Sequence, residues 1–183
     1  MIQNETSSKF SAPLMRPLHQ DSETPWAFVI LPKSASEKLP RRGRTSIDGT
    51  LNAVAFKALL EPDGQLSHWL RISQALLDAT GLTSGDSALF EIRAVEQEPE
   101  PEAPADLTVA LAEVPAALAI WDETTTLARL DWIHWITTAK QAKTRTKRIN
   151  DACAMLASGK RRVCCFDPSG FYSKALSAPK AAL

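Results

Sequence analysis

The spacing of hydrophobic residues differs between the two halves of the chain. In the first half, short runs rich in β-branched and aromatic residues alternate with turn residues, which is typical of strands. Strands are predicted at 26–31, 44–52, 56–60, 67–72 and 88–95. Gly49 inside the second of these strands indicates a bulge. Between the last two strands, residues 73–80 suit a short helix with Ser73 as N-cap and Gly81 at its exit.

Several short strands separated by turns predict a small β-barrel, in which closure of the sheet removes exposed edges. The turn before the last strand supports this fold. Its pattern is hydrophobic-Gly-Asp-x-hydrophobic and resembles the Gly-Asp box of swapped-hairpin and double-psi barrels. The residues that form it are Leu82, Gly85, Asp86 and Leu89.

In the second half, apolar residues recur with the period of a helix. Helices are predicted at 106–113, at 127–136 and at 143–158, with Pro115 in the first turn of another and Gly159 closing the last. The tryptophans of the third helix fall at i and i+3, a spacing that places them in the core. Residues 161–167 suit a short strand or an extended segment covering that core.

An acidic, proline-rich run at 96–105 separates the two patterns and is interpreted as a linker, because such a run buries no apolar area. The sequence thus predicts an α+β protein, with a small N-terminal β-barrel followed by a mostly helical C-terminal domain. The predicted boundaries are a flexible N-terminus at 1–8, a barrel at 9–95, the linker, a helical domain at 106–166 and a flexible tail at 167–183.

Charge is distributed unevenly although the 183 residues are neutral overall, with 21 basic and 21 acidic side chains. Residues 96–137 hold nine acidic groups and one basic group, Arg129. Residues 138–183 hold ten basic groups against Asp151 and Asp167. The neutral total is therefore the sum of an acidic stretch and a basic stretch.

No long apolar run predicts a membrane-spanning helix, and the polar N-terminal residues lack a secretory hydrophobic core, so a cytoplasmic location is expected. Three cysteines without a C-x-x-C pair predict neither a disulfide framework nor a zinc site. Cys153 or Cys165 paired with His134 is the one candidate for nucleophilic catalysis; Cys164 adds a third thiol. No phosphate-binding glycine loop is present, and we expect no cofactor and no metal.

Basic clusters are the remaining candidate site. Positive charge near the start of the helix at 143–158 opposes the helix dipole, which suggests another use for it. Two interpretations stay open: a solvated face that pairs with the acidic stretch, or a surface for an anionic ligand or nucleic acid. The residues predicted to bind an anion or a partner are Arg42, Arg44, Lys140, Arg145, Arg148, Lys160 and Arg161.

Two groups of motifs resemble known bacterial families. In the first half they are Trp26-x-Phe28-x-x-Leu31-Pro32, Gly43-Arg44, Gly49-Thr50-Leu51-Asn52 and Gly85-Asp86. In the second half they are Asp131-Trp132-Ile133-x-Trp135-Ile136, Thr144-Arg145-x-x-Arg148-Ile149 and Gly159-Lys160-Arg161. The first group resembles a small β-barrel domain of unknown function, and the second resembles the YdeI/OmpD-associated domain named for bacteriocin protection.

The resemblance implies a cytosolic, stress-linked bacterial protein and implies neither a reaction nor a cofactor. Together with the basic patch, it leads us to interpret the chain as a non-enzymatic protein that binds an acidic protein partner or a small anionic ligand. A nucleic-acid-binding accessory factor is the first alternative. A small Cys/His-dependent enzyme is the second.

Overall fold

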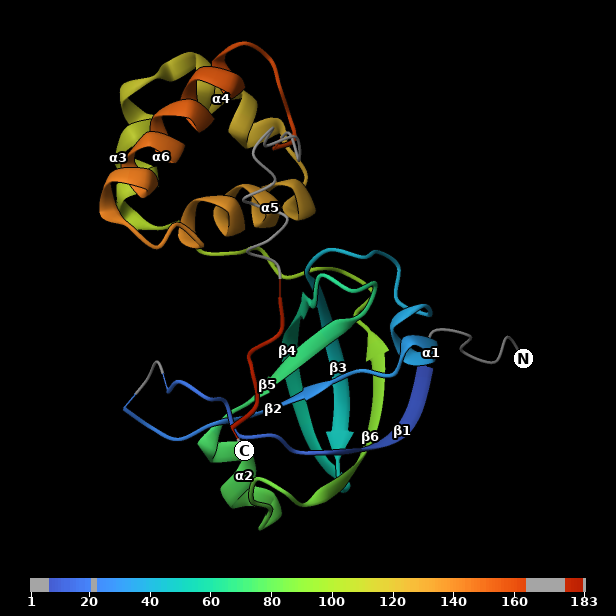
Figure 1. The fold of residues 1–183 in the computed structure, drawn as a ribbon. Helices are drawn as coiled ribbons and strands as arrows, with labels where there is room; N and C mark the ends of the chain where they lie inside the picture. Colours follow the sequence, from blue (N-terminus) through green and yellow to red (C-terminus); the bar gives the residue numbers. More distant parts are fainter. Residues whose placement is uncertain (1–6, 21–22, 164–176, 183) are drawn as a thin grey trace, which may run out of the picture. The chain divides into compact units, whose positions relative to one another are not determined.

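The computed structural model describes residues 7–20, 23–163 and 177–182, and it divides into two units (Figure 1). One unit comprises Met1–Gln97 with Leu176–Leu183, and the other comprises Glu98–Ala175. The boundary therefore falls inside the predicted linker at 96–105, most of which belongs to the second unit. Each unit has its own core.

The first unit is a curled, fully antiparallel sheet of six strands in the order β1-β6-β3-β4-β5-β2 (Figure 1). Its strands are β1 Ser7–Pro13, β2 Ala27–Ile30, β3 Thr45–Leu51, β4 Val54–Pro62, β5 His68–Ile72 and β6 Ser87–Ala94. Just beyond β1, Met15 exchanges two backbone hydrogen bonds of 2.9 Å with Phe28 of β2. This bridge joins the two edge strands of the sheet, which shields them from pairing with other chains.

The alternation of side chains explains the strands that the sequence predicted. In β6, Ala88, Phe90 and Ile92 are buried and the residues between them are exposed. The same inward face on the other strands completes one apolar core. The predicted α+β class and the barrel-like β domain are confirmed. Two elements were not predicted: β1, which begins inside the segment expected to be flexible at 1–8, and the short helix α1 at Lys33–Ser36.

The short helix α2, Gln74–Thr80, forms as predicted. Ser73 is its N-cap and accepts a hydrogen bond from the backbone N–H of Leu76 at 3.3 Å. Gly81 ends it with φ 70°, a left-handed conformation that glycine adopts without steric cost.

Gly49 does not mark a bulge, because the register between β3 and β4 runs without interruption from Thr45 to Leu51. Its role is close packing between strands. A Cβ at this position would lie 2.5 Å from the carbonyl oxygen of Glu91 on β6. Glycine is therefore needed for β3 and β6 to approach each other.

The described part of the second unit, up to residue 163, contains four helices: α3 Ala105–Glu113, α4 Pro115–Glu123, α5 Thr126–Thr137 and α6 Ala142–Ala157. All four lie where the sequence predicted helices, with Pro115 as the first residue of α4. Trp132, fully buried, packs in the core with the apolar stripe of α6, as its helical spacing indicated. Of the predicted extended segment 161–167, residues 161–163 form no strand but Val163 is buried in this core, and residues 164–167 lie outside the described residues.

The C-terminal segment 177–182 pairs with the first unit. The N–H of Leu18 donates to the carbonyl of Lys180 at 2.7 Å, and the N–H of Ala182 donates to the carbonyl of Arg16 at 2.8 Å. Pro17 and Ala181 form a β-bridge. This part of the predicted flexible tail at 167–183 is thus hydrogen bonded to the segment that follows β1.

Candidate functional site

Arg148, one of the predicted binding residues, is built into the helical unit. It lies on α6 and is 6% exposed. Its Nη1 donates to the backbone carbonyl of Trp135 at 2.5 Å and to Thr138 Oγ1 at 3.3 Å, while the guanidinium lies 5.5 Å from the centre of the Trp135 ring. A cation at these C-terminal carbonyls of α5 satisfies acceptors that the helix leaves unpaired. Arg148 therefore joins α5 to α6 and does not face solvent.

Arg145, near the start of α6, forms a two-pronged ion pair with Asp106 in the first turn of α3. The Nε–Oδ2 distance is 2.7 Å and the Nη2–Oδ1 distance is 3.0 Å. The hydrogen bonds from Arg145 lower the pKa of Asp106, and those to Asp106 raise the pKa of Arg145. The pair connects the basic stretch of the sequence to its acidic stretch.

Arg161 makes the second such connection, with Glu123 at the end of α4. Its Nη2 lies 2.6 Å from Glu123 Oε2, and its Nη1 donates to the Glu123 backbone carbonyl at 3.3 Å. Both side chains are more than half exposed, at 54% and 59%. An exposed pair of this kind contributes about 0–1 kcal/mol.

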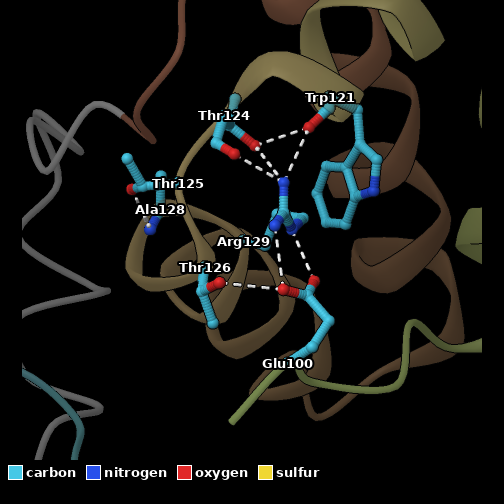
Figure 2. A network of polar contacts seen from close by, with 7 residues as sticks. All are labelled: Glu100, Trp121, Thr124, Thr125, Thr126, Ala128 and Arg129. Atoms are coloured by element: carbon cyan, nitrogen blue, oxygen red, sulfur yellow. Dashed lines mark hydrogen bonds and ion pairs between the residues drawn. The ribbon is translucent and has the colours of Figure 1, made fainter. Parts of the chain in front are cut away.

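Arg129 binds several groups of the helical unit at once (Figure 2). Its Nε and Nη2 donate to the two carboxylate oxygens of Glu100, at 2.5 and 2.8 Å. Its Nη1 donates to the backbone carbonyls of Thr124 and Trp121, at 2.5 and 3.2 Å, at the C-terminal end of α4. The hydrogen bonds from Arg129 lower the pKa of Glu100. This carboxylate, which the sequence placed in a linker, thus helps to hold the helical unit together.

Four cations of the helical unit beyond position 138 are exposed and have no ion-pair partner among the residues that the structure describes: Lys140, Lys143, Lys160 and Arg162. A fifth, Lys147, pairs with Asp151 one turn along α6. The 16 residues of α6 span about 24 Å. Lys140 and Lys143 lie at its start, and Lys160 and Arg162 lie beyond its end. The predicted patch therefore consists of two separate groups.

The start of α6 is the more positive of the two ends of this helix. It has no acidic residue in its first turn, and the N-cap residue Gln141 makes no capping hydrogen bond through its side chain. Helix N–H groups and the helix dipole add positive potential to that of Lys140 and Lys143. This end of the helical unit is suited to contact with carboxylates or other anions.

Arg42 and Arg44, the other two predicted residues, belong to the barrel unit. Arg44 pairs with Glu61 at 2.8 Å and its side chain is 15% exposed. Arg42 is exposed. Of the two, Arg42 is the one available to a ligand.

The barrel unit contains a buried Ser–His contact that the sequence did not reveal. His68 on β5 is 1% exposed, with Nδ1 2.7 Å from Ser36 Oγ and Nε2 2.9 Å from the carbonyl oxygen of Gly43. A carbonyl only accepts, so Nε2 carries the proton and Nδ1 accepts from the Ser36 hydroxyl. Burial lowers the pKa of His68. The two buried side chains tie α1 and the loop before β3 to β5.

The candidate thiol Cys153 is 5% exposed in the helical core, and burial raises its pKa. Both features oppose formation of the thiolate that a nucleophile requires. His134 is likewise buried, whereas Cys164 and Cys165 lie outside the described residues. Within the described ranges, no three His, Cys, Asp or Glu side chains are grouped as metal ligands.

Comparison with protein families assigns the two units separately. Residues 10–92 match the family described as "Domain of unknown function (DUF1905)", and residues 100–159 match the one described as "Bacteriocin-protection, YdeI or OmpD-Associated". The helical unit is therefore a YdeI/OmpD-associated domain. The comparison with curated proteins found no significant match. In the part of the chain that the structure describes, none of the helices of this YdeI/OmpD-associated protein is long and apolar enough to span a bilayer.

Proposed function

We propose that this YdeI/OmpD-associated protein is a non-enzymatic binding protein whose helical unit docks an acidic protein segment at the start of α6. The exposed Lys140 and Lys143, beside an uncapped helix N-terminus, carry this proposal. Arg145 contributes the rim of the surface, since its side chain is one-third exposed while it remains bound to Asp106.

The arrangement of the other cations supports this choice. Arg145, Arg148 and Arg161 already have partners inside the helical unit, so they orient helices. The two lysines at the start of α6 have no such role, and their charge opposes the helix dipole. An external carboxylate would relieve that repulsion.

Two further parts of the proposal concern the cell. We propose a role in bacteriocin protection or a related stress response, because the description of the matching family names bacteriocin protection. We also propose a cytoplasmic location. Fractionation of cells that produce the tagged full chain tests the location, and bacteriocin survival of a deletion strain tests the role.

The binding surface is tested with a fluorescein-labelled peptide of alternating Glu and Ser, by anisotropy at low and physiological salt. We expect Lys140→Glu with Lys143→Glu to weaken binding about tenfold, a change of about 1.4 kcal/mol. The matched control is Lys33→Glu with Lys57→Glu, which makes the same change in net charge on exposed lysines of the barrel unit. Binding by this control is expected to stay within about twofold of wild type.

Equal loss in the two double variants would refute a specific surface, because only net charge would then matter. A wild-type chain that does not bind the peptide at low salt would refute the proposal altogether. A duplex DNA of similar charge forms a third arm. Tighter binding of DNA than of peptide, with a steep salt dependence, would replace the acidic segment by a nucleic acid as the partner.

A further inference from the structure

A groove crosses the outer face of the sheet in the barrel unit, perpendicular to strands β4, β3 and β6, which lie side by side in Figure 1. The register of the strands defines its parts. Its floor is the row Phe56–Gly49–Ile92, in which Gly49 has no side chain and the other two side chains pack into the core. The floor of the groove is therefore backbone.

The two neighbouring rows of outward-facing side chains form the walls. Asp48, Arg93 and Ser7 line one wall, and Ala55, Thr50 and Glu91 line the other. Residues two apart on a strand are about 7 Å apart and adjacent strands about 4.8 Å, so the space between the walls is that of a small molecule. The cavity volume is about 430 Å³, within the range of small-molecule sites.

Opposite charges lie across this groove on crossing diagonals. Asp48 on β3 and Glu91 on β6 supply carboxylates on one diagonal, and Arg93 on β6 and Thr50 on β3 supply donors on the other. Among the residues that the structure describes, neither Glu91 nor Arg93 has an ion-pair partner, and Asp48 is 3.7 Å from Lys57. A ligand in the groove can therefore reach positive and negative side chains on the two adjacent strands β3 and β6.

We propose that this groove binds a small zwitterion, a free amino acid with an apolar side chain. Its ammonium group would lie between Asp48 and Glu91. Its carboxylate would accept from the Arg93 guanidinium and the Thr50 hydroxyl, a geometry that favours a two-pronged contact. Its side chain would lie along Ala55 and the backbone floor. This inference is independent of the acidic segment proposed for the helical unit.

The test is a titration of the ¹⁵N-labelled full chain with L-leucine, followed by amide chemical shifts. We expect saturable shifts at residues 48–50 and 91–93, with a Kd of about 1 mM for a ligand of this size. Two analogues of leucine measure how much each charged group contributes to binding. Isopentylammonium lacks the carboxylate, and 4-methylpentanoate lacks the ammonium group. Each is expected to bind about tenfold more weakly than leucine.

Arg93→Gln and Glu91→Gln are each expected to weaken leucine binding about fivefold or more. Arg16→Gln and Glu37→Gln, which change the same residue types at exposed positions outside the groove, are the matched controls and should stay within about twofold. Thr50→Val, which removes one hydroxyl, provides a third groove variant that keeps the β3 backbone. Its weakened binding would support the site even where a charge variant is unstable.

Leucine that causes no saturable shift at residues 48–50 and 91–93 up to about ten times the expected Kd would overturn the proposal. So would single-charge analogues that bind as tightly as leucine. Loss in the control variants equal to that in the groove variants would assign the effect to overall charge and overturn the site. Lys140→Glu with Lys143→Glu should leave leucine binding unchanged, which separates this result from that of the helical unit.

Discussion

The buried contact of His68 with Ser36 makes the stability of the barrel unit dependent on pH. The neutral ring donates from Nε2 to the Gly43 carbonyl and accepts at Nδ1 from the Ser36 hydroxyl, at 2.9 and 2.7 Å. Protonation would add a hydrogen to Nδ1, which now accepts the hydrogen bond from the Ser36 hydroxyl. It would also place a positive charge on a side chain that is 1% exposed. The folded state therefore resists protonation, and the pKa of His68 is lowered mainly by burial.

The sign of the effect follows from linkage. As the pH falls, the unfolded chain binds this proton first, at its ordinary pKa of about 6.5, while the folded chain does not. The contribution to stability is complete above that pKa and is lost below it. One proton changes the free energy of unfolding by at most about 1.4 kcal/mol per pH unit, so lowering the pH from about 7.5 to about 5.5 costs at most about 1.4 kcal/mol.

The assay is urea unfolding of the barrel unit at both pH values, followed through the amide signals of β5. Wild type should lose more stability at low pH than His68→Gln, which keeps a donor toward Gly43 and cannot be protonated. His19→Gln, at an exposed histidine, should behave as wild type. Equal losses in wild type and His68→Gln would refute the reasoning. Ser36→Ala gives a second check, because loss of the donor to Nδ1 should also make the pH dependence shallower.

Three further changes test the packing of the two units. Ala53 has φ 70° in the two-residue turn between β3 and β4, so Ala53→Gly should raise the free energy of unfolding by about 1 kcal/mol. A lower free energy of unfolding would show that the turn is not strained. Arg129→Met should cost about 1–3 kcal/mol in urea unfolding, because it removes the hydrogen bonds to two carbonyls and the ion pair with Glu100. Arg161→Met, at an exposed pair, should cost less than about 1 kcal/mol. A chain that ends at Leu176 loses two backbone hydrogen bonds to residues 16–18, so the free energy of unfolding of its barrel unit should fall by about 1–3 kcal/mol. An unchanged melting curve of the barrel unit would show that the pairing is not populated.

Local pattern predicted most of the elements because burial of one face imposes a period on the sequence. The strand β6 was predicted from strict alternation, and α5 from tryptophans at helical spacing. The strand β1 lacks such a signal, since Phe10 and Ala12 are its main apolar residues and it ends at Pro13. It is a strand because it pairs with β6, and no local pattern reports a partner about eighty residues away in sequence.

The C-terminal segment illustrates the same limit more strongly. Its hydrogen bonds to residues 16–18 use backbone atoms, which every sequence has, and its side chains are small or exposed. Composition predicted a flexible tail at 167–183 for that reason. Likewise, the acids and prolines of 96–105 predicted a linker, although the Glu100 carboxylate is bound by Arg129.

Counting charges located the basic stretch of the helical unit but did not distinguish its arginines from its lysines. The structure uses most of them differently, although Arg162 is exposed like the lysines and Lys147 pairs with Asp151. Arg129, Arg145 and Arg148 each bind two or more acceptors on another element. A planar guanidinium with five donors can satisfy a carboxylate and helix-end carbonyls together, whereas an ammonium group is strongly hydrated and is more easily left in water. Lys140 and Lys143 are exposed accordingly. A surface that meets an external anion is therefore expected at the lysines, and replacing either lysine by arginine should preserve peptide binding, whereas replacing Arg145 by lysine should weaken the link between α3 and α6.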